Sequence, residues 1–443
     1  MKGKRILALL LCAMVILMAL SACGGSTGTD GNQQTTPTIQ PQGQEPAKDQ
    51  PKVTLIYSIW DTNQEPAMKA MCEAFTKENP NITVKVEVSP WDQYWTKLDA
   101  AAQAGTMSDV LWMSISQAAK YVKGQMVEML DDRIKADGFD MSVYPEALVK
   151  GAQMFGKQFG IPKDFDTIAF FYNKTLFDQA NVPYPKDDWT WDDMVATAKK
   201  LTDPEKGIYG VAASYDNQQA TYNTIAAGGG YVISPDGKSS GYDRPETMEA
   251  MKIWTDLINV HKVSPTQKFL TDNFNLDLFS SGKVAMVSGG SWNVAYFKDI
   301  EGFDNKWDVV SFPLYKGKRS VVINGLTNVM AANGKHSDEA WKLLKFLGNK
   351  ESAEISANMG AAIPAYNGTQ GGWVEAGTGY NLQKAFIDEV KNAVPYSTSP
   401  SRPVWGLAEE ENFIKAWDGQ ISLEEACKNV AKAMNEAIAE ENE

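Results

Sequence analysis

Residues 53–88 read VTLIYSIWDTNQEPAMKAMCEAFTKENPNITVKVEV. Apolar residues alternate with others from Val53 to Ile59, which predicts a strand. After Pro66, apolar residues recur at helical spacing until Asn79-Pro80, where the predicted helix ends. The alternation returns at 82–88, so a second strand is expected there. A strand, a helix and a strand within about 35 residues predict a βαβ unit, in which the two strands run parallel.

The segments that follow continue this mixture of helices and strands. The sequence predicts a helix over Trp95–Ala104 and a short buried strand over Val110–Met113. Thr190-Trp191-Asp192-Asp193 is similar to a capping box at the start of a helix. Ser337 and Ser422 are expected to cap two further helices. The chain is therefore predicted to be an α/β protein.

The amino terminus has the layout of a secretory signal peptide. Basic residues precede the apolar run Ile6–Leu20, which is shorter than the ~18 residues that a membrane-spanning helix needs. Leu20-Ser21-Ala22-Cys23 resembles the bacterial lipobox, so residues 1–22 are expected to be removed and Cys23 to be lipidated. The alternative is an uncleaved membrane anchor in which Cys23 is incidental. Residues 23–51 are expected to form a disordered linker, because they are rich in Gly, Thr, Gln and Pro.

Length, charge and aromatic content narrow the class of protein. The chain has 443 residues, more than the ~300 at which a single hydrophobic core usually gives way to two domains. Its net charge is −13 and it has no block of Lys and Arg, which excludes nucleic acid as the expected partner. Its 13 tryptophans suit a site that stacks on flat apolar ligand faces, although core packing accounts for most of them equally well.

Histidine, cysteine and motif content give no sign of a metal or cofactor. His261 and His336 are the only histidines and no Cys-x-x-Cys occurs, so no metal and no cofactor are expected. Cys72 and Cys427 could form a disulfide, but two buried free thiols are the favoured interpretation. The chain has no phosphate-binding loop, His-Glu-x-x-His or Gly-x-Ser-x-Gly motif. A histidine-dependent hydrolase is therefore not expected.

Asp164 and Asp166 are the one pair of residues that resembles a catalytic arrangement. Two carboxylates could serve glycoside hydrolysis as acid and base. They could equally accept hydrogen bonds from sugar hydroxyl groups, because each ionised carboxylate offers about four acceptor sites. A third interpretation is an ordinary solvated loop. The sequence around the pair leaves these alternatives open.

Several segments together resemble the extracellular solute-binding proteins of ABC importers, in the carbohydrate-binding family that includes maltose-binding protein. Gly105-Thr106-Met107-Ser108-Asp109-Val110 is similar to the family's turn into a strand, with Ser108 in place of the usual proline. Gly160-Ile161-Pro162 followed by 171–177 resembles the family's crossover segment. The other similar segments are 188–193, 279–292, 312–314, 324–326 and 340–347. Their shared order behind a lipobox makes the joint match strong.

The resemblance implies two α/β lobes, each a mostly parallel sheet flanked by helices, that close on a ligand about three hinge crossings. The first lobe is expected to comprise 52–162 and 320–362, and the second 163–319 and 363–443. The crossings are expected near Ile161–Thr167, Phe312–Asn324 and Ala361–Pro364. A monomer is expected that binds a mono- or oligosaccharide, catalyses no reaction and serves an ABC permease from the extracytoplasmic face of the cell membrane.

The expected ligand-binding residues supply aromatic faces and hydrogen-bonding groups, which is what a sugar requires. Trp60 and Asp61 follow the first predicted strand, and ligands of open α/β sheets bind beyond the carboxyl ends of strands. The resemblance places Trp292 and Trp405 as stacking aromatics. The full set is Trp60, Asp61, Ser116, Asp164, Asp166, Ser291, Trp292, Asn324, Arg402 and Trp405. The alternative functions are a glycoside-active surface enzyme using Asp164 and Asp166, and a binding protein for another solute such as a peptide or polyamine.

Overall fold

The computed structural model describes residues 51–441. The predicted signal peptide, Cys23 and all of the predicted linker except Pro51 lie outside the described residues. Within 51–441, the helices are all too short or too polar to cross a membrane.

The first sheet has five strands in the order β2-β1-β3-β12-β6. Its strands are β1 (Val53–Ile59), β2 (Ile82–Val88), β3 (Val110–Ser114), β6 (Ile161–Pro162) and β12 (Leu326–Met330). β1 pairs in parallel with β2 and β3, while β12 runs antiparallel to β3 and β6. The βαβ unit predicted from 53–88 is confirmed, with α1 (Glu65–Glu78) between its two strands. The carboxyl ends of β1 and β3 consequently meet at one edge of the sheet, where Trp60 and Ser114 lie.

The second sheet has the strand order β10-β8-β9. Its strands are β8 (Ile168–Asn173), β9 (Met286–Gly290) and β10 (Trp307–Ser311). Both pairings are antiparallel, which differs from the mostly parallel sheet expected for this half of the chain. The reason is that β8 is the central strand and runs opposite to both neighbours. In the described residues, parallel bridges flank this sheet at its edge, such as Tyr209 with Val284 and Ala212 with Val287.

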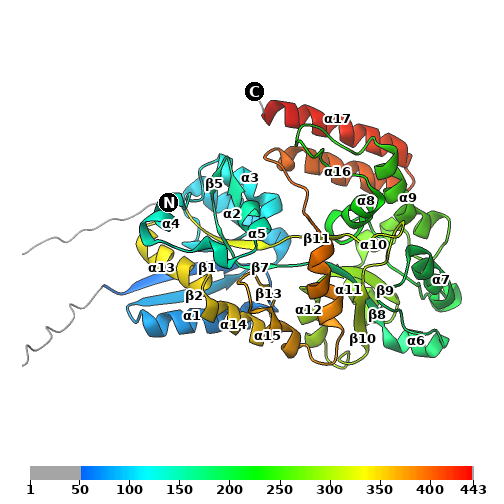
Figure 1. The fold of residues 1–443 in the computed structure, drawn as a ribbon, viewed down its shortest axis with the longest axis horizontal. Helices are drawn as coiled ribbons and strands as arrows, with labels where there is room; N and C mark the ends of the chain where they lie inside the picture. Colours follow the sequence, from blue (N-terminus) through cyan, green and yellow to red (C-terminus); the bar gives the residue numbers. More distant parts are fainter. Residues whose placement is uncertain (1–50, 442–443) are drawn as a thin grey trace, which may run out of the picture. The chain divides into compact units, whose positions relative to one another are not determined.

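Helices surround both sheets (Figure 1). In the part of the chain that builds the first sheet they are α1, α2 (Trp91–Ala104), α3 (Ile115–Lys123), α4 (Asp131–Asp137), α5 (Glu146–Gly151), α13 (Ser337–Leu347) and α14 (Lys350–Asn358). The others are α6 (Lys174–Ala180), α7 (Trp191–Leu201), α8 (Tyr222–Gly228), α9 (Pro245–Asn259), α10 (Gln267–Asp272), α11 (Asn275–Ser280), α12 (Asn293–Asp299), α15 (Gln370–Ala376), α16 (Arg402–Trp417) and α17 (Leu423–Glu441). α16 and α17 lie side by side, and α16 also contacts α3.

Short strands join the segments that run between the two sheets. β7 (Asp164–Phe165) links β6 to β8 and pairs with β13 (Ile363–Pro364). β11 (Val321–Ile323) pairs with β14 (Ala393–Pro395) just before the chain re-enters the first sheet at β12. The remaining pair, β4 (Gln153–Met154) with β5 (Lys157–Gln158), is a small hairpin. The predicted crossing segments around 161–167, 324 and 361–364 therefore lie next to one another.

Three of the predicted helix starts can be compared with the structure directly. Thr190 and Asp193 form the predicted capping box, and Glu425 N donates to Ser422 Oγ at 3.0 Å. Ser337 is wrong as a cap, because His336 occupies that position and the Ser337 hydroxyl bonds to Arg133 and Glu128 instead.

The helix predicted over Trp95–Ala104 starts earlier, at Trp91. Pro90 precedes it in an extended conformation, and its carbonyl oxygen accepts the first helical hydrogen bond, from Tyr94 N, at 2.8 Å. A proline fits this position because the amide donors of a first helical turn need no partner within the helix. The earlier start adds Trp91 to the residues near the end of β1.

Cys72 and Cys427 are free and buried, as favoured from the sequence. They lie in two different clusters of buried hydrophobic residues. Burial raises the pKa of each thiol to about 12, because the charged thiolate is poorly solvated there. Both cysteines therefore act as small apolar core residues.

Candidate functional site

A cavity of about 700 Å³ lies at the carboxyl ends of β1, β3 and β9, next to the crossing segments. Its wall on one side includes Trp60, Asp61 and Ser114, and on the other Ser291 and Trp292. This is the position at which open α/β sheets bind ligands. An adjoining cavity of about 400 Å³ shares Trp91, Trp292 and several polar residues with it.

The structure brings nine of the ten sequence-predicted site residues to these two cavities. The main cavity is lined by seven of them, namely Trp60, Asp61, Asp164, Asp166, Ser291, Trp292 and Asn324. Ser116 and Arg402 line the adjoining cavity. Trp405 is not among the described residues that line either one.

Trp405 occupies a core position in place of the predicted ligand contact. Its side chain is 0% exposed, and its indole Nε1 donates to Ser399 Oγ at 2.9 Å. The Arg402 guanidinium covers the ring face at 4.2 Å from the ring centre. Because α16 begins at Arg402, Trp405 lies one turn further on, on the face of the helix that packs inward. The stacking role predicted for Trp405 is corrected accordingly.

Arg402 itself is held by internal partners. It forms an ion pair with Glu409 at 2.5 Å, and its Nη2 donates to the Tyr396 hydroxyl at 3.0 Å. Glu409 also accepts hydrogen bonds from the hydroxyl groups of Tyr222 and Tyr242. The charge of Arg402 is thus neutralised within the protein, although part of its side chain borders the adjoining cavity.

Aromatic side chains face the main cavity from both sides. Trp60 packs against Trp91 at a ring-centre distance of 5.1 Å and against Trp112 at 5.0 Å, both edge to face. Trp91 is 42% exposed and Phe274, on the opposite side, is 59% exposed. Trp292 and Tyr296 complete the second aromatic wall. Flat apolar faces are therefore available on both sides of a bound molecule.

Gly290 allows the Trp292 ring to fold back over the end of β9. A Cβ atom at position 290 would lie 1.8 Å from a ring carbon of Trp292, closer than any real contact. The absence of a side chain at Gly290 leaves room at the end of β9. In the structure that room is filled by the indole itself, which fixes where the ring can lie.

Asp164 is buried, and both of its carboxylate oxygens accept hydrogen bonds. One carboxylate oxygen accepts from Lys163 Nζ at 2.5 Å and the other from Leu326 N at 3.0 Å. Lys163 Nζ also donates to Gln64 Oε1 at 2.9 Å. Asp164 therefore ties the first crossing segment to the return into β12, and its charge is balanced.

Asp166 is half-buried and belongs to a small hydrogen-bonded network. Gln218 Nε2 donates to Asp166 Oδ1 at 2.7 Å, and Asn324 Nδ2 donates to Gln218 Oε1 at 3.0 Å. Among residues 51–441, Asn324 Oδ1 has no hydrogen-bond partner. Burial, reinforced by the nearby charge of Asp164, raises the pKa of Asp166 well above its usual range.

The sequence analysis missed the polar turn that reaches into both cavities. Asp216 caps a π-helical turn over Asn217–Thr221, and Gln218 and Gln219 line the site from it. The run Asp216-Asn217-Gln218-Gln219 was the available signal, since four polar residues precede the apolar residues of α8. Trp91 was missed for a simpler reason, because the start of α2 was placed too late.

No group of three or more metal-ligating side chains occurs in the part of the chain that the structure describes. The site is instead built from aromatic rings, carboxylates and amides. Aromatic rings offer flat apolar faces, and carboxylates and amides offer hydrogen-bonding atoms.

Comparison with known proteins identifies the family. Residues 60–354 match the family described as bacterial extracellular solute-binding protein. This chain belongs to that family. The galactooligosaccharide-binding protein of Bacillus subtilis (strain 168) is 26% identical over 380 residues, which cover 82% of this chain and 81% of that protein. The maltodextrin-binding protein MdxE of the same organism is 26% identical over 421 residues, covering 89% of this chain and 92% of MdxE.

A solved structure of another binding protein has the same fold as this chain. The ABC substrate-binding protein Lmo0181 from Listeria monocytogenes, in complex with cycloalternan, superposes with a TM-score of 0.80 at 25% identity. The match covers 88% of this chain and 99% of that one. The family resemblance and the two-lobed α/β fold inferred from the sequence are thereby confirmed. The relatives in this bacterial solute-binding family are binding proteins, not enzymes.

Proposed function

We propose that this protein captures a mono- or oligosaccharide between its two lobes and delivers it to the permease of an ABC importer. We further propose that a lipid on Cys23 holds it as a monomer at the extracytoplasmic face of the cell membrane. The lobes in this proposal are 52–162 with 320–362, and 163–319 with 363–443. The crossing segments between the lobes then act as the hinge.

The observation that carries the proposal is the pairing of aromatic walls with uncharged hydrogen-bonding groups in one cavity. Trp60 and Trp91 face it from one side, and Trp292 from the other. Gln218 and Asn324 lie between these walls. Sugars present apolar C–H faces edged by hydroxyl groups, so they need both kinds of contact at once.

The carboxylates of the cavity argue against a polycationic solute. Asp164 is paired with Lys163, and Asp61 accepts from Asn63 N and Gln64 Nε2. Asp216 accepts two hydrogen bonds from Gln219. Each of these three carboxylates already accepts hydrogen bonds from the protein, whereas a polyamine, which only donates, would need carboxylates as its direct partners. The two relatives from Bacillus subtilis, a galactooligosaccharide-binding protein and a maltodextrin-binding protein, support a sugar as well.

A thermal-shift screen against a sugar library tests the proposal most directly. A sugar at 100 times its dissociation constant should stabilise the folded protein by about 2.7 kcal/mol. Polyamines and short peptides serve as controls, and each hit is incubated with the protein to look for new reducing ends. Stabilisation by polyamines and not by sugars would contradict the proposal. Release of reducing ends would instead support the glycoside-active enzyme.

A further inference from the structure

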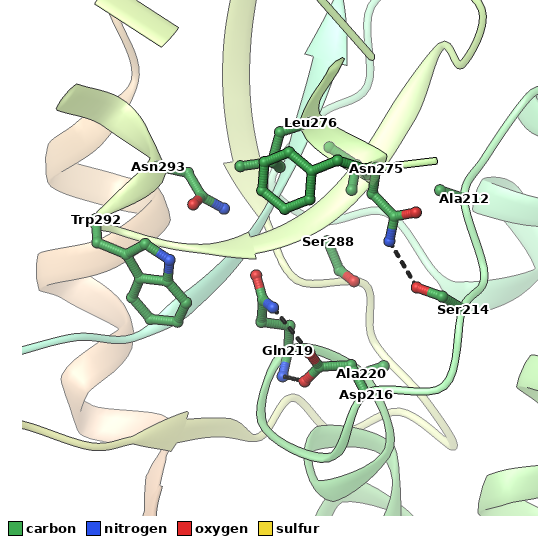
Figure 2. Close-up of a pocket in the computed structure, with 12 residues that line it drawn as sticks. Ala212, Ser214, Asp216, Gln219, Ala220, Asn275, Leu276, Ser288, Trp292 and Asn293 are labelled. Atoms are coloured by element: carbon green, nitrogen blue, oxygen red, sulfur yellow. Dashed lines mark hydrogen bonds between the residues drawn. The ribbon is translucent and has the colours of Figure 1, made fainter. Parts of the chain in front are cut away.

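A side chamber of about 130 Å³ lies beside Trp292 (Figure 2). Its walls come from segments around the second sheet, at 212–220, 274–276, 287–288 and 292–293. The two spaces adjoin, because six residues line both of them, namely Asp216, Gln219, Phe274, Leu276, Trp292 and Asn293. The first sheet contributes none of the lining residues described for it.

Two buried polar atoms of this lining lack a hydrogen-bond partner within residues 51–441. They are Asn275 Oδ1, an acceptor, and Asn293 Nδ2, a donor. Asn293 is only 2% exposed. Buried polar groups in folded proteins are almost always paired, so two such atoms in one small chamber indicate that a bound molecule supplies their partners.

The other polar groups of the chamber are held in place by the protein. In the structure Asn275 Nδ2 donates to Ser214 Oγ at 2.6 Å, and Oδ1 is the unpaired atom of this amide (Figure 2). Asp216 accepts from Gln219 N at 2.6 Å and from Gln219 Nε2 at 2.9 Å. Burial raises the pKa of Asp216 from its usual value. The chamber is therefore prebuilt and poorly suited to a charged group.

Apart from the hydroxyl of Ser288, the rest of the lining is apolar, and the space is small. Ala212 and Val287, which are joined by a β-bridge, form one wall with Leu276 nearby. A single water needs roughly 10–15 Å³, so about 130 Å³ accommodates more than isolated water molecules. The chamber is much smaller than the 700 Å³ main cavity, so only the end of a longer ligand can enter it.

We propose that this chamber is a terminal subsite that takes the hydroxyl-bearing end of an oligosaccharide whose remaining units lie in the main cavity. A hydroxyl group both donates and accepts, so the end unit satisfies Asn275 Oδ1 and Asn293 Nδ2 together. An ammonium group only donates and a carboxylate only accepts, and each would leave one of the two atoms unpaired. This inference rests on the proposed sugar-binding function.

Two substitutions inside the chamber test the subsite. Ser288→Leu places a larger apolar side chain in the space from β9, and Asn293→Asp keeps the side-chain shape but replaces the donor by an acceptor. Calorimetric titration uses maltotriose and β-1,4-galactotriose, and the trisaccharide that wild-type protein binds more tightly is followed. Both variants should bind it at least about tenfold more weakly, and thermal melts of each variant establish that the titrated protein is folded. Ser281→Leu, at an exposed position after α11, is the matched control and should bind like the wild type.

The outcomes separate this inference from the function on which it rests. Wild-type affinity in both chamber variants overturns the subsite, since the chamber then holds ordered water only, while sugar binding by the wild type leaves the proposed function standing. If Ser288→Leu does not fold, the affinity of Asn293→Asp alone decides whether the chamber is a subsite. If the wild type binds neither trisaccharide nor any other sugar in the library, the proposed function fails and the subsite fails with it.

Discussion

Asp166 and Asn324, which are far apart in the chain, pair through their backbones at the floor of the main cavity. Asp166 N donates to Asn324 O at 2.9 Å, and Asn324 N donates to Asp166 O at 3.3 Å. This isolated bridge joins the outgoing crossing to the returning one. Their side chains are joined a second time through Gln218. A ligand that contacts this network therefore touches the point about which the lobes are proposed to move.

Replacement of Gln218 by Ala should weaken sugar binding by about tenfold or more. The change leaves Asp166 and Asn324 without their shared partner, and a buried polar group that loses its partner costs roughly 1–3 kcal/mol. Gln420→Ala, at an exposed position between α16 and α17, is the matched control. Calorimetric titration of both variants with the best sugar from the screen checks the result. Equal affinity in Gln218→Ala and wild-type protein would show that the network does not take part in binding.

Trp292→Ala and Trp405→Ala should have opposite consequences. Trp292 lines the main cavity, so its loss should reduce sugar affinity by about thirtyfold, or roughly 2 kcal/mol, with little change in melting temperature. Trp405 is a fully buried core residue, so its loss should lower the free energy of unfolding by ~3–5 kcal/mol. The folded fraction of Trp405→Ala should still bind sugar. Calorimetric titration and thermal melts of both variants distinguish the two roles, and a reversed pattern would refute the assignment.

The elements that could be predicted from the sequence are those set by local patterns. The strand over Val53–Ile59 has the burial pattern that its alternation predicts, and the Thr190–Asp193 capping box depends on residues three positions apart. Trp60 was predictable as a site residue because it directly follows a strand that could be recognised from alternation alone.

The features that could not be predicted depend on distant partners. Gln218 acquires its role from Asp166, 52 residues away, and from Asn324, 106 residues away. Trp405 is buried because its helix, α16, packs inward. Glu409 of the same helix accepts hydrogen bonds from Tyr222 and Tyr242, which lie 187 and 167 residues before Glu409. No pattern around Ser401–Trp405 encodes those contacts. Local sequence therefore indicates where a site begins, while tertiary contacts decide which side chains complete it.

Cys23→Ala should release the protein from the membrane or stall its processing. The prediction follows from the lipobox-like Leu20-Ser21-Ala22-Cys23, because only the thiol of Cys23 can carry the proposed lipid. Partitioning of the wild type and the variant between detergent and aqueous phases measures the effect. The wild type should enter the detergent phase and the variant the aqueous phase. Recovery of both forms in the aqueous phase would remove the lipid anchor from the proposed function.

Asp166→Asn should make the protein more stable at neutral pH, by an amount that depends on pH. Burial and the neighbouring Asp164 raise the folded-state pKa of Asp166 above its ordinary value. Between the unfolded and folded pKa values the folded protein holds the extra proton, so its stability falls as pH rises through that window. Asn cannot ionise and avoids this loss.

The pH dependence of the difference between Asp166→Asn and wild type isolates this one group. Asp216 also has a raised pKa, but it is present in both proteins and its contribution cancels in the difference. Thermal melts without ligand from about pH 4 to about pH 8 should show nearly equal stability at the acid end. The stability of the variant relative to the wild type should increase steadily as the pH rises. This difference should level off once Asp166 is fully ionised in the wild type. A constant difference across this range would mean that Asp166 ionises as readily in the folded protein as in the unfolded chain.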